Sequence, residues 1–152
     1  ALLAALAKRL AAEDADAFTP HSLANIAWAL AKLDFQDASL TDMIAAQTSR
    51  RLPEFQPRDM ATVVWAFASL GVRDEALLGA LAAHVVDNER LDDFNAQDIA
   101  NTVWAFATLE ALHPALMDAV AVQLSRRGAL AGFSAQAVAN LAWAFAKLDV
   151  PA

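Results

Sequence analysis

Residues 94–110 read FNAQDIANTVWAFATLE, and close copies of this segment recur along the whole chain. The other copies are FTPHSLANIAWALAKLD at 18–34, FQPRDMATVVWAFASLG at 55–71 and FSAQAVANLAWAFAKLD at 133–149. Their opening phenylalanines are 37, 39 and 39 residues apart, and each is followed ten residues later by one of the four tryptophans of the chain. Phe, Ala, Trp, Ala, Ala and Leu are identical in all copies at the first, seventh, eleventh, twelfth, fourteenth and sixteenth places. A period of this length is typical of helical-repeat proteins.

Each copy begins like a helix and is followed by a second one. The residue after the phenylalanine is a good N-cap in three copies, as Thr19, Asn95 and Ser134. A short polar or turn segment ends each copy, after which apolar residues at helical spacing resume. We expect these second helices at 38–52, 74–88 and 113–127, with a remnant at 2–12.

The sequence therefore predicts an all-α protein, an α-solenoid in which helix-turn-helix repeats of about 38 residues stack into a right-handed superhelix. The apolar content of 58% and the few glycines and prolines agree with a packed helical protein. We divide this single solenoid into a half repeat at 1–17, full repeats at 18–54, 55–93 and 94–132, and a further first helix at 133–152. Because both ends cut through a repeat, we expect a piece of a longer protein whose uncapped apolar ends can self-associate.

One face of the first helix is polar in every copy. Counted from the phenylalanine as zero, positions three, seven and fourteen fall together, because each residue turns the helix by about 100°. These positions hold no acidic residue, and they are occupied by His21, Asn25, Lys32, Arg58, Thr62, Ser69, Gln97, Asn101, Thr108, Gln136, Asn140 and Lys147. Since stacked helices lie side by side, we expect the twelve side chains to form a ladder across one surface.

This polar stripe favours the binding of single-stranded RNA. Amide, guanidinium, hydroxyl and amine groups recognise base edges, and helical repeats can read one base each. We expect bases to contact the amides Asn25, Asn101, Asn140, Gln97 and Gln136, and we expect charge and register to be set by Lys32, Arg58 and Lys147. The net charge of −7 opposes nucleic-acid binding, but most of the 18 acidic residues fall outside the first helices, so the stripe can be locally positive.

Other interpretations of the same features stay open. The stripe could be only a solvated polar face, and the array could be a protein-protein interaction scaffold or a structural component of an RNA-protein particle. The tryptophans either pack as knobs between repeats or offer stacking platforms for bases. Basic pairs near the ends of the second helices either complement the helix dipole or contact phosphates, namely Lys8–Arg9, Arg50–Arg51 and Arg126–Arg127.

The sequence gives little support to an enzyme, a metal site or a cofactor. It has no cysteine, and its three histidines, at 21, 84 and 113, lack ligand-like spacing. The four glycines form no phosphate loop, and no serine lies in a nucleophile elbow. The adjacent acids Asp92 and Asp93 are typical of a solvated loop. The longest apolar stretch, 60–72, is too short to span a bilayer, so we expect no membrane partner.

The segments WALAKL, WAFASL, WAFATL and WAFAKL, each ten residues after a phenylalanine, resemble the octotricopeptide repeat family. The resemblance covers nearly the whole chain. Members of that family are α-solenoids that bind RNA and control organellar gene expression, in algal chloroplasts and also in mitochondria, through transcript stabilisation, processing, splicing or translation. The resemblance therefore implies an RNA-binding role in a chloroplast or mitochondrion. The RAP domain that often ends such proteins is not in this chain.

Overall fold

The computed structural model describes residues 1–150, and every regular element in this range is helical. The α-helices are α1 (Leu2–Ala11), α2 (Pro20–Lys32), α3 (Ala38–Arg50), α4 (Pro57–Leu70), α5 (Glu75–Asp87), α6 (Ala96–Thr108), α7 (Pro114–Ser125) and α8 (Ala135–Lys147). The all-α fold class is thus confirmed, and each helix lies where the repeat pattern predicts it. The second helices end one or two residues early, because the chain then tightens into short 3₁₀ turns.

Those turns are a regular part of the repeat that the sequence pattern does not reveal. Each directly precedes the phenylalanine that opens a copy, and they are η1 (Ala15–Ala17), η2 (Leu52–Glu54), η3 (Arg90–Asp93) and η4 (Ala129–Gly132). In the first of them the carboxylate of Asp14 caps the turn by accepting from the backbone N–H of Asp16 at 3.1 Å. The turns lead the chain from the second helix of one repeat to the first helix of the next.

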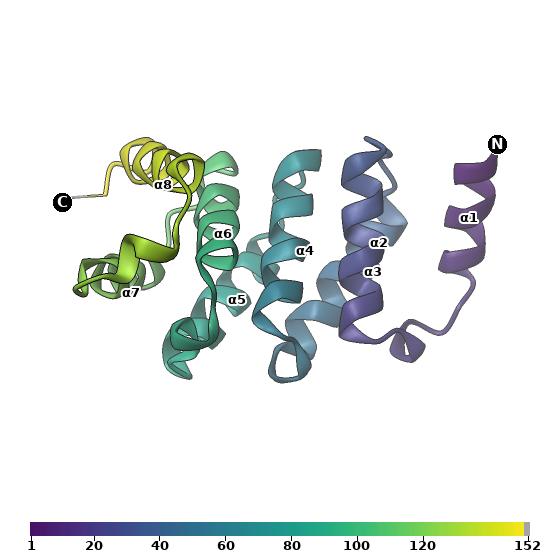
Figure 1. Ribbon diagram of the computed structural model, residues 1–152. Coiled ribbons are helices and arrows are strands. Elements are labelled where there is room, and N and C mark those ends of the chain that lie inside the picture. Colours follow the sequence, from purple (N-terminus) through teal and green to yellow (C-terminus); the bar gives the residue numbers. More distant parts are fainter. Residues whose placement is uncertain (151–152) are drawn as a thin grey trace.

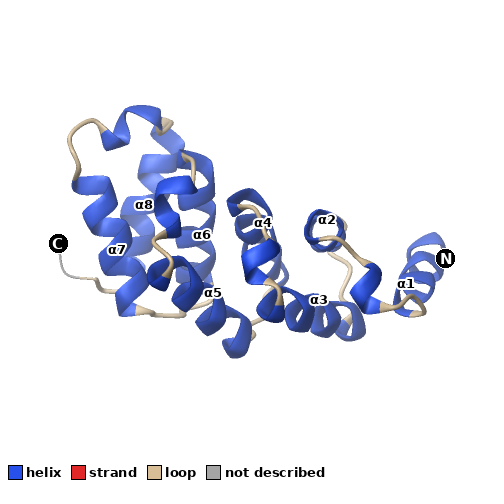
Figure 2. Ribbon diagram, turned by 90° about the horizontal axis from the view of Figure 1, so that it is seen from below, coloured by secondary structure: helices blue, strands red, loops and turns tan. Residues whose placement is uncertain are grey.

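The helices form two layers. In one layer, α2, α4, α6 and α8 each pack on the next, and in the other, α1, α3, α5 and α7 do the same. Figure 1 shows the resulting elongated array, with the N-terminus at one end and the C-terminus at the other, and Figure 2 shows the same array from below. We call α2, α4, α6 and α8 the first-helix layer, because they contain the four repeated segments.

The core lies between the layers and between successive repeats. The invariant leucines and alanines of the interior repeats are buried, and so are Phe67 and Phe106, at 1% and 0% exposure. The opening phenylalanines Phe55 and Phe94 are also buried, whereas the end copies leave theirs only partly covered. Burial therefore depends on the presence of a neighbouring repeat on both sides, as expected for a solenoid.

Each first helix ends in a left-handed turn. The residue after the conserved leucine has a positive φ in all four copies, with 48° at Asp34, 71° at Gly71, 54° at Glu110 and 53° at Asp149. The next N–H then donates back into the helix, as from Phe35 to the carbonyl of Leu30 at 2.9 Å. This closure is a Schellman motif, and glycine alone adopts its conformation without steric cost.

We expect Asp34→Gly to raise the free energy of unfolding by about 0.5–1 kcal/mol, because glycine relieves the left-handed strain. Gly71→Ala is the reverse experiment and should lower it by about 1–2 kcal/mol. A Cβ at Gly71 would meet no atom within 4 Å, so the loss would come from the backbone alone. Urea denaturation of both variants provides the measurement, and an alanine variant as stable as the parent would contradict the left-handed turn.

Candidate functional site

The polar stripe lies on the open surface of the first-helix layer, and we call it the polar wall. None of its twelve residues is buried as a whole, although the Oγ1 of Thr108 is buried and has no hydrogen-bond partner. Four are half-buried, namely Thr62, Asn101, Thr108 and Asn140, and the others are exposed. The wall is therefore accessible along α2, α4, α6 and α8, whose side-by-side order is visible in Figure 1.

Two shallow clefts show that the wall residues of successive helices come together. One, of about 370 Å³, lies across three helices and is lined by Trp28, Lys32, Thr62, Trp65, Gln97 and Asn101. The other, of about 330 Å³, lies between α2 and α4, and its lining includes His21, Asn25, Arg58 and Thr62. The three-helix cleft runs diagonally across the wall. It joins Lys32 at position fourteen in α2 to Thr62 at position seven in α4, and to Gln97 and Asn101 at positions three and seven in α6.

The tryptophans border the wall and differ with their place in the array. Trp28 and Trp143 are 48% and 46% exposed, whereas Trp65 and Trp104 are half-buried and packed against the core. Trp28 lines both clefts, and the Nζ of Lys32 lies 5.7 Å from the centroid of its ring, within cation–π range. The interior tryptophans thus serve the packing between repeats, and every tryptophan keeps some surface beside the wall.

Two amide pairs are preorganised on the wall. The Nε2 of Gln97 donates to the Oδ1 of Asn101 at 2.8 Å, and the Nε2 of Gln136 donates to the Oδ1 of Asn140 at 3.0 Å. Each bond joins positions three and seven of the same helix. A side-chain amide has two N–H donors and a carbonyl acceptor, so each pair keeps the donors of its asparagine and the acceptor of its glutamine for a ligand.

Position three also contacts the next repeat. The Nδ1 of His21 lies 3.1 Å from the Oδ1 of Asp59, which occupies position four of the following copy. Burial raises the pKa of the Asp98 carboxyl, whereas the backbone N–H of Asn95 and the positive charge of Arg58, at position three of the preceding copy, lower it. In the last copy, position four is Ala137 instead of an acid. Position three of the copy before it is the uncharged Gln97. The charge at position three of one copy therefore complements the residue at position four of the next copy. The spacing of residues within one helix does not reveal this relation.

The wall is less positive than its sequence suggests. The Nζ of Lys147 pairs with the Oε1 of Glu110 at 3.1 Å, and Glu110 directly follows the preceding first helix of the layer. With His21 and Arg58 beside buried aspartates, three of the four basic positions have an acidic neighbour. Lys32 instead lies over the ring of Trp28. The wall thus offers mainly amide, hydroxyl and aromatic groups.

Two of the basic pairs, Arg50–Arg51 and Arg126–Arg127, tie parts of the array together that are far apart in the sequence. Arg50 pairs with Asp16 at 2.9 Å, and Arg126 pairs with Asp92 at 3.0 Å. Arg51 instead joins the two ends of its own repeat, because its Nη1 donates to the carbonyl of Phe18 at 2.8 Å, across 33 residues of sequence. These contacts favour a structural role over phosphate binding. For Arg51 and Arg90 the sequence signal was an arginine four residues before the phenylalanine that opens the next copy.

Arg90 shows that the same link exists in the repeat that lacks a basic pair. Its Nη2 donates to the carbonyl of Phe55 at 3.3 Å, as Arg51 donates to the carbonyl of Phe18 one repeat earlier.

Within residues 1–150, no group of three or more His, Cys, Asp or Glu side chains could hold a metal ion. In the same range, each helix is too short or too polar to cross a membrane.

The fold and the polar wall define the class of the protein as a helical-repeat array with an accessible binding surface. The family model of the RNA-editing substrate-binding complex 6 protein matches residues 1–150, and the chain belongs to this family. The family is part of a mitochondrial RNA-editing complex, which gives it an RNA-related organellar role. No curated protein matches the chain. The match supports the mitochondrion rather than the chloroplast, and it does not show the octotricopeptide family that the motifs resemble.

Proposed function

We propose that this chain binds single-stranded RNA along the polar wall, as a non-catalytic subunit of a mitochondrial RNA-editing substrate-binding complex. The observation that carries the proposal is the three-helix cleft, where two tryptophans, two amides, a lysine and a threonine from consecutive repeats meet on an open surface. Membership of a family named for a complex that binds RNA-editing substrates supports the same ligand class.

The chemistry of the cleft suits an unpaired nucleotide. The exposed face of Trp28 stacks on a base, and the free donors of Asn101 and the acceptor of Gln97 bond to its edge. Lys32 contacts the phosphate backbone, since it extends over Trp28 toward the same cleft. Recognition through stacking and amides needs little positive charge, which accommodates a chain whose net charge is −7.

Short single-stranded RNAs selected from a random pool provide the test of this proposal. Because few wall cations lack an acidic neighbour, we expect one to three phosphate contacts, and hence a shallow slope of about −0.7 to −2 for log K against log salt. Asn101→Asp should weaken binding of the preferred RNA by about 1–3 kcal/mol, because one pair of N–H donors is lost. Far-ultraviolet circular dichroism should stay unchanged, because Gln97 can still donate to the aspartate.

Two outcomes of this experiment would contradict the proposal. The first is the absence of any enriched RNA at low salt, which would remove RNA as the ligand. The second is an Asn101→Asp variant that selects the same sequences with the same affinity as the parent, which would remove the wall as the reading surface. Ala83→Glu, an exposed site on α5 in the other layer, is the control for added charge.

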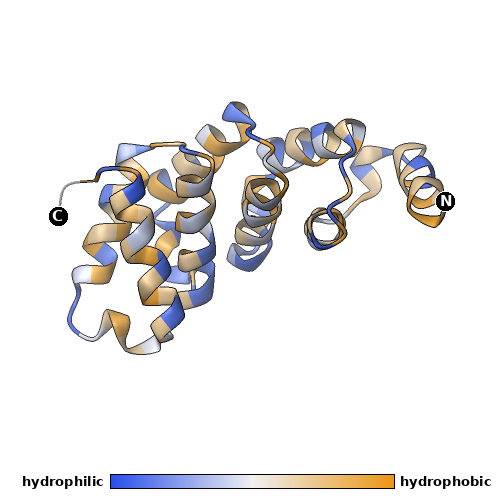
Figure 3. Ribbon diagram, turned by 90° about the horizontal axis from the view of Figure 1, so that it is seen from above, coloured by the Kyte–Doolittle hydropathy of each residue, from blue (hydrophilic) through white to orange (hydrophobic). Residues whose placement is uncertain are grey.

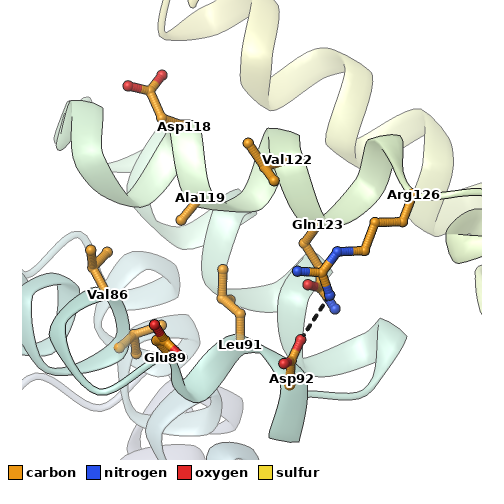
Figure 4. Close-up of a pocket in the computed structure, with 10 residues that line it drawn as sticks. Val86, Glu89, Leu91, Asp92, Asp118, Ala119, Val122, Gln123 and Arg126 are labelled. Atoms are coloured by element: carbon orange, nitrogen blue, oxygen red, sulfur yellow. Dashed lines mark hydrogen bonds and ion pairs between the residues drawn. The ribbon is translucent and has the colours of Figure 1, made fainter.

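Protein binding is a second candidate function, and a groove in the other layer favours it. The groove has a volume of about 410 Å³ and lies between α5, η3 and α7. Figure 4 shows its apolar residues, among them Val86, Leu91 and Val122, with carboxylates at its rim. A protein partner bound there would leave the polar wall open, and its affinity would depend less on salt than RNA binding does.

A further inference from the structure

The second helices α3, α5 and α7 pack on one another less closely than the first helices do, so their layer is the more open of the two. Two hollows lie between α5 and α7, one of about 410 Å³ and one of about 250 Å³. Val86 lines both hollows, so they belong to a single groove, which we call the α5–α7 groove. On the α7 side its lining extends from His113 to Arg126, a length of about 20 Å at the helical rise.

The floor of this groove is more apolar than the repeat requires. Counted from the phenylalanine that opens each copy, the position of Val86 holds Ser49 in α3 and Ser125 in α7. The position of Val122 holds alanine in the two other copies, and Val122 is 63% exposed. Larger apolar side chains thus replace serine and alanine on an exposed surface, which is typical of a protein-binding patch.

The exposure of Val122 is a property of its position in the repeat. The equivalent Ala83 is exposed although α5 has α3 on one side and α7 on the other, and the equivalent Ala46 of α3 is exposed between α1 and α5. A further helix packed beside α7 would therefore leave Val122 exposed. Such a helix would also lie outside the α5–α7 groove, because α5 and α7 are already neighbours.

Carboxylates line the rim of the groove. Glu89 follows α5 and Asp118 lies on α7, and among the described residues neither forms a salt bridge. Of the described residues that line the groove, Arg126 is the single lysine or arginine, and it already pairs with Asp92 at 3.0 Å (Figure 4). Figure 3 shows hydrophobic and hydrophilic residues side by side on the helices near the C-terminal end of the array, where the groove lies. The groove therefore combines an apolar floor with uncompensated negative charge.

Glu89 keeps its carboxylate at the rim at a cost to the fold. Its backbone is left-handed, with a φ of 51°, whereas the next copy has Gly128 at the same position, with a φ of 78°. Glycine adopts this conformation without steric cost and glutamate does not. A strained residue of this kind is more common at functional sites than elsewhere.

We propose that the α5–α7 groove binds a basic amphipathic helix of a protein partner. The apolar face of that helix packs on Val86, Leu91 and Val122, as a third helix fills the groove between two others. Lysines or arginines beside the apolar face pair with Glu89 and Asp118, which would repel the phosphates of RNA. The inference rests on protein binding, the second candidate function, and it does not depend on RNA binding at the polar wall.

Peptides of about 16 residues, selected from a random displayed library on the parent chain, test this proposal. The selected peptides should carry apolar residues at helical spacing and an excess of lysine and arginine. Fluorescence polarisation of labelled synthetic copies gives their affinities. Val86→Ser combined with Val122→Ala should weaken binding at least about tenfold, because both apolar contacts are reduced. The fold should persist, since other copies have serine and alanine at these positions.

The matched control combines Ser49→Ala with Ala46→Ser, which changes the same two positions of the repeat in α3. Its peptide affinity should stay within about twofold of the parent. Peptides that bind the groove variant and the parent equally well would overturn the proposal. So would a selection that enriches no peptide, or one that enriches peptides without the apolar and basic pattern.

Charge exchange tests the rim separately from the floor. Glu89→Lys combined with Asp118→Lys should weaken binding of the selected peptide at least about tenfold, and a peptide whose lysines and arginines are replaced by glutamate should prefer this variant to the parent. Glu89→Gly should raise the urea midpoint and yet weaken peptide binding, because it relieves the strain and removes the carboxylate. A glycine variant with parent-like peptide affinity would remove Glu89 from the site.

The same variants separate this inference from the proposed RNA binding. The groove variants should keep the RNA affinity of the parent, because α5 and α7 lie in the layer opposite the polar wall. Asn101→Asp should in turn keep the peptide affinity of the parent. Loss of peptide binding in both Asn101→Asp and the groove variants would mean that the peptide does not bind specifically in the groove.

Discussion

Replacing Phe106 with alanine is expected to lower the free energy of unfolding by about 3–5 kcal/mol, the largest stability loss of any single substitution described here. Its ring is 0% exposed and packs edge-on against His113, with ring centroids 5.4 Å apart. Truncation would remove the apolar contacts between α6 and the turn into α7, and it would leave a cavity inside the third repeat. Urea denaturation followed by circular dichroism provides the measurement.

Phe145→Ala is the matched control, because it is the same residue type at the same position of the repeat. Phe145 is only partly buried, because among residues 1–150 α8 has a neighbour in the first-helix layer on one side only, namely α6. Its loss should be clearly smaller, at about 1–2 kcal/mol. Equal losses in both variants would contradict the repeat-dependent burial on which the fold description rests.

The helical layout could be predicted from the sequence because the repeat is expressed four times. A ten-residue spacing to tryptophan and a closing leucine recur in each copy, and a good N-cap recurs in three, so the helix bounds follow from local rules that do not need tertiary structure. The exposed stripe could be predicted for the same reason, since helical periodicity alone places its three positions on one face.

The contacts between residues far apart in the sequence could not be predicted in this way. The pairing of His21 with Asp59, and the link from Arg51 to the carbonyl of Phe18, each join residues more than 30 positions apart. Each depends on the offset between neighbouring helices, which the pattern within one helix does not contain. For that reason the sequence suggested a more positive wall than the structure has. For the arginines near the ends of the second helices it offered the helix dipole or phosphate as partners, and not Asp16, Asp92 or the carbonyl of Phe18.

Substituting Asn25, Asn101 and Asn140 together by aspartate is expected to weaken RNA binding by at least about 100-fold, the largest functional effect that we predict. Each change replaces two N–H donors with a carboxylate oxygen on the polar wall and adds one negative charge near the RNA backbone. The fold should persist, because Gln97 and Gln136 can donate to an aspartate as they do to asparagine. Titration of a fluorescent RNA preferred by the parent chain gives the affinities.

The most direct test compares this triple variant with Ala46→Glu, Ala83→Glu and Val122→Glu combined, which adds the same charge at exposed sites of α3, α5 and α7 in the other layer. We predict that the wall variant loses at least about 100-fold in RNA affinity at the same salt concentration, while the control stays within about threefold of the parent. Equal losses in the two variants would mean that net charge alone controls binding. Parent-like affinity in the wall variant would show that RNA does not bind at the polar wall.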